Sequence, residues 1–239
     1  MAQTKSLLEE KIEMQMPLIG LYDAPDPAVF EPIVEPDGPG HLCVFKYFNH
    51  WSNGETLHLT VEKHGCDGCA NALFDHQVKS RNEYLDFLVD GEGLKKSKTL
   101  MNQWIDRMNN YQPEYNHIFI GPLKTIAGKF LKTVTYFITP DQLSLLVYAA
   151  NYHAAPMDPA PIIAPFGAGC MQLISVFDDL SIAQAAIGAT DLAMRMHVPK
   201  NILAFTTTVP MHTRINQLDE QSFLGKPFLK SLKARRNIY

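Results

Sequence analysis

The hydrophobic and polar positions of the chain follow two periods, one of about two residues and one of about 3.6. Residues 56–62 alternate between apolar and polar side chains at every second position, which is typical of a half-buried strand. Apolar residues near helical spacing predict an amphipathic helix within residues 4–16 and two helices between residues 80 and 110. Short runs of β-branched and aromatic residues predict further strands at residues 18–22, 117–120, 133–138, 161–166, 185–191 and 202–209.

The strongest local signal for a helix start is the sequence Thr139-Pro140-Asp141-Gln142. A threonine at the N-cap, a proline at the first helical position and a glutamine two residues further on are the parts of a capping box. From residue 117 onward strands alternate with helices, so we expect at least one strand-helix-strand crossover. The pattern predicts an α/β or α+β fold with a mixed sheet flanked by helices, in a single domain over residues 1–239. A proline-rich loop, residues 23–40, lies within it.

Composition and charge narrow the classes of partner. The chain of 239 residues is 46% hydrophobic and 19% charged, which is typical of a globular protein, and its formal net charge is -4. This charge gives no general attraction to nucleic acids or anionic membranes, and we expect neither as a partner. The N-terminus has no apolar signal-like run and no later segment is long enough to cross a bilayer, so we expect a cytoplasmic protein. In that reducing compartment the four cysteines are expected to be buried thiols, a redox pair or metal ligands rather than disulfides.

Two of the cysteines lie two residues apart in the sequence His64-Gly65-Cys66-Asp67-Gly68-Cys69. Gly65 and Gly68 allow a tight bend, so both sulfurs can point at one centre. A predicted strand precedes this bend and small helical residues follow it. Cys66 and Cys69 are therefore predicted to lie where a strand passes into a helix, where the positive helix end favours a thiolate.

The other two cysteines, Cys43 and Cys170, are distant in sequence. Cys43 belongs to an aromatic-rich stretch, residues 41–51, and if this stretch is helical, Cys43, Tyr47 and His50 share one face. Cys170 follows Gly167-Ala168-Gly169 and is predicted to lie in the first turn of a helix that ends at Asp178-Asp179. The glycines there would let the backbone come close to whatever the Cys170 sulfur faces.

These motifs resemble those of the family of domain of unknown function 169, which occurs largely in archaea and anaerobic bacteria. The family's motifs match His41-Leu42-Cys43, the stretch from His64 to Leu73, and Gly167-Ala168-Gly169-Cys170. The resemblance implies a single domain, but it implies no activity because the family has none that is settled. Two positions depart from the pattern: Cys69 replaces an expected glycine, and Ala189 stands where many members have a further cysteine.

Three hypotheses about function remain open. In the first, Cys43, Cys66, Cys69 and Cys170, with His64 beside them, form an iron-sulfur site, or a zinc site as the alternative, that acts in redox or cofactor handling. In the second, Cys66 and Cys69 are a dithiol redox pair, although Asp67 between them opposes a low thiol pKa. In the third, a metal-free pocket binds a small molecule, with Phe45, Tyr47, Phe48 and Trp51 and the two glycine-cysteine loops as its walls.

The expected partner is accordingly a small molecule or a redox protein, and the sequence predicts neither the reaction nor the oligomeric state. We find no dinucleotide fingerprint, phosphate loop, nucleophile elbow or His-Glu-x-x-His motif. Their absence counts against the common nucleotide-dependent, hydrolase and protease classes.

Overall fold

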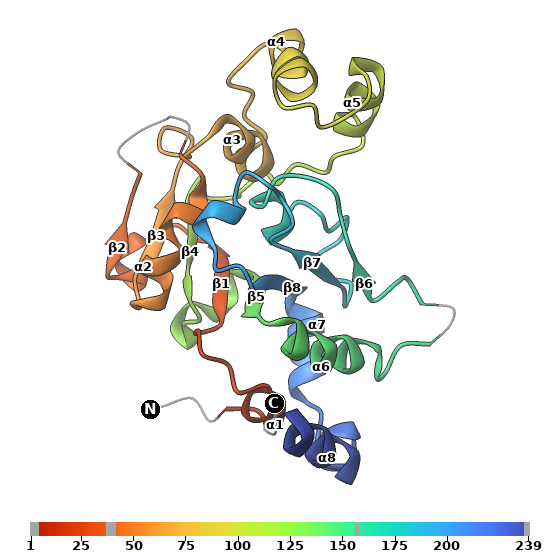
Figure 1. Cartoon of the computed structure of the whole chain (residues 1–239). Coiled ribbons are helices and arrows are strands. Elements are labelled where there is room, and N and C mark those ends of the chain that lie inside the picture. The colour runs from red at the N-terminus through yellow and green to blue at the C-terminus, as the bar shows by residue number, and fades with distance from the viewer. Residues whose placement is uncertain (1–4, 37–41, 156–157, 237–239) are drawn as a thin grey trace.

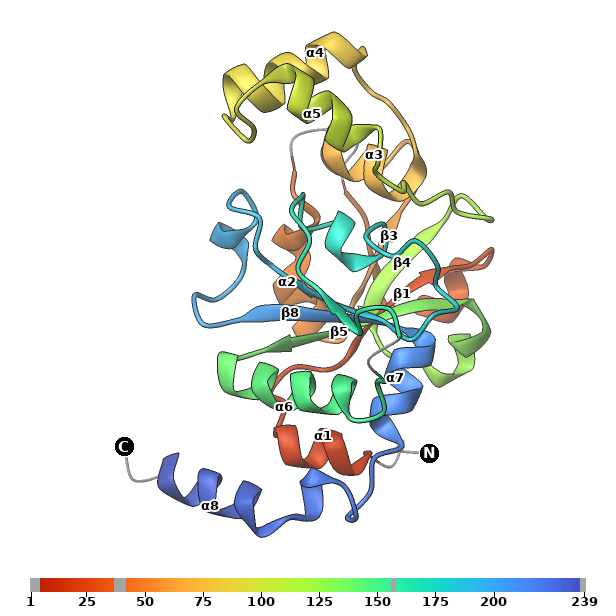
Figure 2. The same cartoon turned by 90° about the vertical axis from the view of Figure 1, so that its right-hand side faces the viewer.

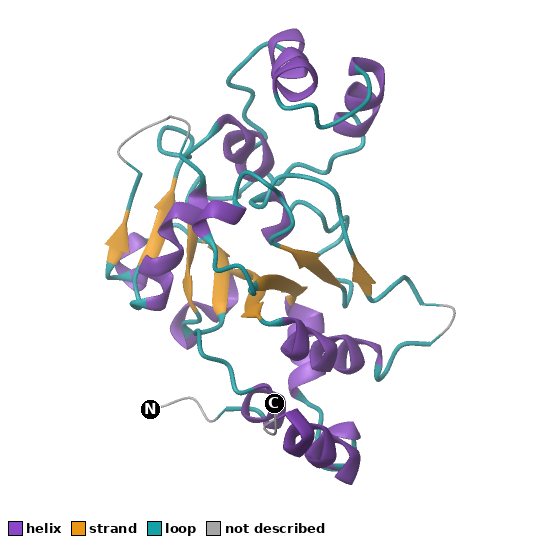
Figure 3. Ribbon diagram, in the orientation of Figure 1, coloured by secondary structure: helices purple, strands orange, loops and turns teal. Residues whose placement is uncertain are grey.

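The computed structural model describes residues 5–36, 42–155 and 158–236, and in these residues one mixed sheet carries the fold (Figures 1 and 3). Its strand order is β2-β3-β4-β1-β5-β8-β7-β6. In chain order the strands are β1 (Ile19–Asp23), β2 (Ile33–Val34), β3 (Thr56–Leu59), β4 (Ile118–Pro122), β5 (Leu131–Ile138), β6 (Ile162–Ile163), β7 (Ala185–Gly188) and β8 (Leu203–Thr208). The predicted mixed sheet flanked by helices is confirmed.

The helices connect and cover the strands. They are α1 (Leu7–Ile12), α2 (Phe48–Ser52), α3 (Asp67–Phe74), α4 (Arg81–Leu85), α5 (Lys98–Ile105), α6 (Pro140–Asn151), α7 (Val209–Asn216) and α8 (Pro227–Arg236). A π-helix (Asp86–Gly91) continues α4, and short 3-10 helices include Val44–Tyr47 and Met171–Leu173. None of the described helices combines the length and apolar character that crossing a bilayer requires.

Strand pairing is antiparallel in the middle of the sheet and parallel at its two edges. The pairs β2-β3 and β6-β7 are parallel, while β3-β4, β4-β1, β1-β5, β5-β8 and β8-β7 are antiparallel. The connection from β6 to β7 is the expected crossover, but its helical part is only the three-residue 3-10 helix Met171–Leu173. The fold is therefore of the α+β class rather than a regular α/β alternation.

The sheet separates two hydrophobic cores, and the alternation of β5 explains the division. Val134, Tyr136 and Ile138 belong to the core beneath α1, α6 and α7, whereas Phe137 belongs to the core on the other face. Successive side chains of a strand point to opposite faces, so one strand serves both cores. Figure 2 shows the result as layers, with α1, α6 and α8 on one side of the sheet and α3, α4 and α5 on the other.

Local sequence accounts for where the best-defined helix begins. The Thr139 hydroxyl accepts a hydrogen bond from the Gln142 backbone N–H, and the Gln142 side chain accepts one from the Thr139 backbone N–H at 2.8 Å. Both halves of the predicted capping box are thus formed, and α6 starts at Pro140. The same arrangement of Ser80 and Glu83 starts α4.

Three local predictions differ from the structure. Residues 41–51 do not form one helix, because Cys43 is an extended N-cap before the 3-10 helix Val44–Tyr47, so Cys43 does not share a helical face with His50. The helix predicted after Cys170 is only a 3-10 turn that stops at Leu173, since the next residue, Ile174, leaves the helical region with φ -156° and ψ -49°. The proline-rich loop contains the short strand β2, and its residues 37–40, like His41, lie outside the described part of the chain.

Candidate functional site

A cavity of about 460 Å³ lies between the helical hairpin α4–α5 and the loops on that side of the sheet. Its lining comes from five stretches: residues 43–44, 66–68, 84–104, 166–171 and 190–197. A volume of this size is within the usual range for small-molecule sites, which are concave and mostly apolar with a few polar groups. The cavity is therefore the candidate site of this protein.

The cavity collects the cysteines from all three regions in which the sequence placed them. Cys43, Cys66 and Cys170 line it directly. Cys69 lies in the first turn of α3, is fully buried, and shares a side-chain hydrogen bond with Cys170. The four thiols thus form one group at the wall of one cavity, although their role in binding a cofactor stays a prediction.

Two glycines let the backbone segments that carry these cysteines approach one another. Gly65 has φ +84°, and a Cβ atom there would lie 2.7 Å from the carbonyl oxygen of Leu42, next to Cys43. A Cβ atom on Gly169 would lie 2.4 Å from Sδ of Met194 and 2.8 Å from the ring of Phe45. No side chain fits at either place without displacing its neighbours, so both glycines are needed to bring the cysteines together.

Burial decides the ionisation of the thiols. It raises the pKa of Cys43 to about 12 and that of Cys66 to about 11, with smaller increases from the charge of Cys170. The pKa of Cys69 lies well above its ordinary value for the same reason. These thiols are protonated at neutral pH, whereas an attacking cysteine needs a lowered pKa. The arrangement therefore gives little support to a dithiol redox enzyme.

His64 lies beside this group but faces the backbone. It is buried, and its Nδ1 lies 3.3 Å from the carbonyl oxygen of Cys66, to which it donates a hydrogen bond. Burial lowers the pKa of His64. It is not among the residues that line the cavity, so its visible role is to orient the bend before α3.

No group of three or more histidine, cysteine or acidic side chains in the described residues is placed around a single metal ion. A tetrahedral zinc site draws four ligand atoms to about 2.0–2.3 Å from one point. Within the described residues the cysteines form no such centre, and iron-sulfur or zinc binding stays a prediction.

The aromatic walls of the cavity are not those expected from the sequence. Phe45, Phe48 and Trp51 are buried in the core against Phe137, and neither they nor Tyr47 line the cavity. The rings that line it are instead Tyr84, Phe87, Trp104 and Phe166. The hydrophobic periodicity of residues 80–110 predicted only that Tyr84 and Trp104 lie in helices. It does not indicate that the hairpin of α4 and α5 covers the cysteines.

Carboxylates supply the charge in the cavity. Asp67 pairs with Lys79 at 2.7 Å, and Asp191 accepts hydrogen bonds from the backbone N–H groups of Gly169 and Ala193 at 3.1 and 3.0 Å. The Glu92 carboxylate forms no hydrogen bond or ion pair with the side chain or backbone of another described residue, and burial and the charge of Asp191 raise its pKa. The lining residues include no lysine or arginine.

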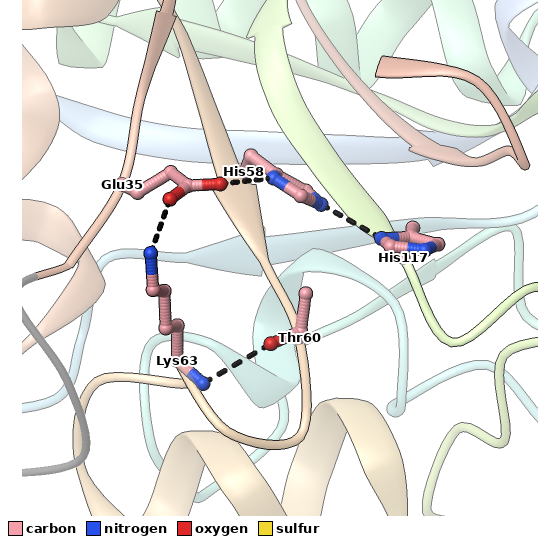
Figure 4. Close-up of polar contacts among 5 residues, drawn as sticks. All are labelled: Glu35, His58, Thr60, Lys63 and His117. Carbon is pink, nitrogen blue, oxygen red and sulfur yellow. Dashed lines mark hydrogen bonds and ion pairs between the residues drawn. The ribbon is translucent and has the colours of Figure 1, made fainter.

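A second polar cluster, which we call the histidine relay, joins Glu35, His58, Lys63 and His117 at the β2-β3-β4 edge of the sheet (Figure 4). Glu35 Oε1 lies 2.6 Å from Nδ1 of His58, and its Oε2 lies 2.5 Å from Nζ of Lys63. Nε2 of His58 lies 2.9 Å from Nδ1 of His117. The ring of His58 also stacks on that of Phe119, with their centroids 4.6 Å apart, and this contact fixes the orientation of the imidazole.

The hydrogen bonds of the relay fix its protons. Lys63 lowers the pKa of Glu35, so the carboxylate is ionised and accepts the Nδ1–H of His58. Burial lowers the pKa of His58, whose Nε2 therefore accepts the Nδ1–H of His117. Single-residue arguments missed this relay because its members are far apart in sequence.

The relay also holds the turn that leads to the cysteines. Thr60 and Lys63 exchange two backbone hydrogen bonds, at 3.2 and 3.1 Å, and Lys63 is tied to Glu35. The chain passes from this turn through His64 into Cys66. The relay thus fixes the end of β3 from which the candidate site begins.

Comparison with known proteins identifies a family and nothing finer. The model of the DUF169 family, described as uncharacterised ArCR, matches residues 8–217. No curated protein and no solved structure matches the chain. The matched region includes all four cysteines, both glycine-cysteine loops and the residues of the histidine relay. The chain therefore belongs to the DUF169 family.

Proposed function

We propose that the protein binds a small, largely apolar molecule in the cysteine-lined cavity, in a reducing cytosol that keeps the thiols free. The observation that carries this proposal is the cavity itself, about 460 Å³ in volume, with four aromatic rings and three thiols in its wall, of which those of Cys43 and Cys66 are protonated. Apolar walls with a few convergent polar groups are the usual form of a ligand site.

Exposed apolar side chains around the cavity support the same function. Leu192 and Met196 are 85% and 82% exposed, and Phe87, Leu94 and Phe166 are also exposed. All five belong to the cavity lining. Apolar surface gathered at one place on a protein marks a binding site more often than scattered apolar residues do.

Binding of the neutral dye Nile red to the purified full chain tests this proposal. We expect enhanced fluorescence that disappears in the variant Ala168→Trp, whose side chain fills the wall of the cavity. The control Ile126→Trp adds the same ring at an exposed position outside the cavity and is expected to bind like the unchanged protein. Equal binding by both variants would contradict the proposal.

The second candidate is an iron-sulfur cluster held by Cys43, Cys66, Cys69 and Cys170. The favouring observation is that four sulfurs from three chain regions meet at one wall. A bound cation lowers the pKa of a thiol and releases its proton, so the protonated state does not oppose this fit. Such a cluster would supply electron transfer beside the cavity.

Purification without oxygen, followed by a visible spectrum and iron, sulfide and zinc analysis, separates the two candidates. A cluster requires matching iron and sulfide, and both should be lost in Cys43→Ser and in Cys170→Ser. A colourless, metal-free protein that binds Nile red would leave the first candidate and remove the second.

A further inference from the structure

The charge distribution of the cavity defines which ligands it accepts. Of the side chains that line it, Asp67, Glu92 and Asp191 carry carboxylates, and none is a lysine or arginine. The charge of Asp67 is offset by Lys79, which leaves Glu92 and Asp191. His197 is the one imidazole in the lining. The lining residues themselves therefore offer an anionic ligand no permanent cation, and the nearest ammonium groups, those of Lys79 and Lys95, lie against the rings of Phe87 and Phe166.

Glu92 is the side chain best placed to meet a ligand. It is exposed at the hairpin between α4 and α5, and its carboxylate forms no hydrogen bond or ion pair with another described residue. Asp191 is different, since the Gly169 and Ala193 backbone groups already bind its carboxylate. A positive group of a ligand in the cavity would form an ion pair with Glu92, and the charge of Asp191 would attract it as well.

The aromatic rings add attraction for a cation. Nζ of Lys95 lies 4.0 Å from the centroid of Phe166, and Nζ of Lys79 lies 5.0 Å from that of Phe87. Ammonium groups within about 6 Å of a ring are attracted by the negative face of its π system. An ammonium group of this chain therefore already lies over each of these two rings, and the rings of Tyr84 and Trp104 are the ones left for a ligand cation.

We infer that the cavity selects an organic cation, with a protonated amine or quaternary ammonium group beside Glu92 and the aromatic rings and an apolar body against the thiols. This inference rests on the proposed function, because it names the class of ligand for the same cavity. A site made of aromatic rings and carboxylates recognises an ammonium group, and the ligand needs no phosphate or carboxylate of its own.

Three probes that share a phenylbutyl body test the inference by calorimetry on the purified full chain. They are (4-phenylbutyl)trimethylammonium, the uncharged analogue with carbon in place of nitrogen, and 5-phenylpentanoate. We expect the cation to bind at least about tenfold more tightly than the uncharged analogue, and the anion to bind least. Higher salt should weaken only the cation.

Two variants test whether the charge of Glu92 causes the preference for the cation. Glu92→Gln removes the charge at the cavity, and we expect it to weaken cation binding about fivefold or more while leaving the uncharged analogue unchanged. Glu62→Gln makes the same change of net charge at a solvent-exposed carboxylate outside the cavity and should change neither. Because both side chains are solvent-facing, folding is expected to be preserved in each.

The outcomes distinguish an error in the class of ligand from the absence of a ligand site. Equal binding of the cation and its uncharged analogue, or loss of cation binding in Glu62→Gln as large as in Glu92→Gln, would overturn the inference and leave a ligand cavity. Failure of all three probes and of Nile red would overturn the proposed function, and this inference with it.

Discussion

The cysteine cavity and the histidine relay both gather titratable side chains from distant parts of the chain, yet their ionisation is decided by opposite effects. In the cavity, burial is the largest influence and keeps Cys43 and Cys66 protonated. In the relay, the hydrogen bond from Lys63 is the largest influence on Glu35 and keeps it ionised. Burial without a partner neutralises a group, whereas a partner of opposite charge preserves its charge. The thiols of the cavity therefore offer uncharged contacts, whereas the relay keeps the ion pair of Glu35 and Lys63.

The largest expected effect concerns the packing on which the cavity depends. Gly169→Val places a side chain where a Cβ alone would lie 2.4 Å from Met194 Sδ, and overpacking of this kind costs about 3 kcal/mol of unfolding free energy. Gly128→Val is the control, because no atom lies within 4 Å of a Cβ there. Urea denaturation measures both. Equal losses would show that the approach at Gly169 is not required.

The next effect concerns thiol reactivity in metal-free protein. With the pKa of Cys66 raised from 9.0 to about 11, its thiolate fraction at neutral pH falls about 100-fold, and alkylation by iodoacetamide should slow by a similar factor. Peptide mass spectrometry of timed samples gives the rate at Cys66 itself, and the rate should keep rising with pH beyond pH 9. An alkylation rate at pH 7 equal to that of a free cysteine would show that burial does not keep Cys66 protonated, and the contrast with the ionised Glu35 of the relay would be lost.

A smaller effect is expected for the relay. Glu35→Gln leaves an acceptor for His58 but removes the charge that pairs with Lys63, which should cost about 1 kcal/mol because solvent screens part of the pair. The pKa of Glu35 is lowered on folding, so this stability is present above the ordinary value of 4.5 and is lost as pH falls through the lower folded value. Denaturation at a series of pH values should show the variant and the unchanged protein converging in acid. A constant difference would refute the charge argument.

The smallest effect is expected at the exposed end of the relay. Lys63→Met removes the ammonium group but keeps the length of the side chain, and since Lys63 is 45% exposed the loss should be about 0.5 kcal/mol. The same variant should raise the pKa of Glu35, measured by NMR titration, because the Lys63 hydrogen bond is the main cause of its lowering. An unchanged Glu35 pKa would assign the lowering to His58 instead.

Some features could be predicted from the sequence because the interactions that form them are local. The capping box of Thr139 and Gln142 spans four residues, and α6 begins where it predicts. The alternation within β5 and the strand-to-helix bend at Cys66 likewise depend on neighbours in sequence. Hydrogen bonds and backbone preferences over a few residues suffice for such elements.

Other features were decided only by the tertiary structure. Cys43 and Cys170 lie 127 positions apart, and their meeting depends on strand order and on the close approaches at Gly65 and Gly169. The predicted aromatic wall failed because Phe45 and Trp51 were equally suited to a core, and packing against Phe137 places them there. The pairing of His58 with His117 is non-local in the same way. A one-dimensional pattern states which residues are apolar or ionisable, but only the folded chain determines which of them are neighbours, because long-range contacts depend on the arrangement of whole elements.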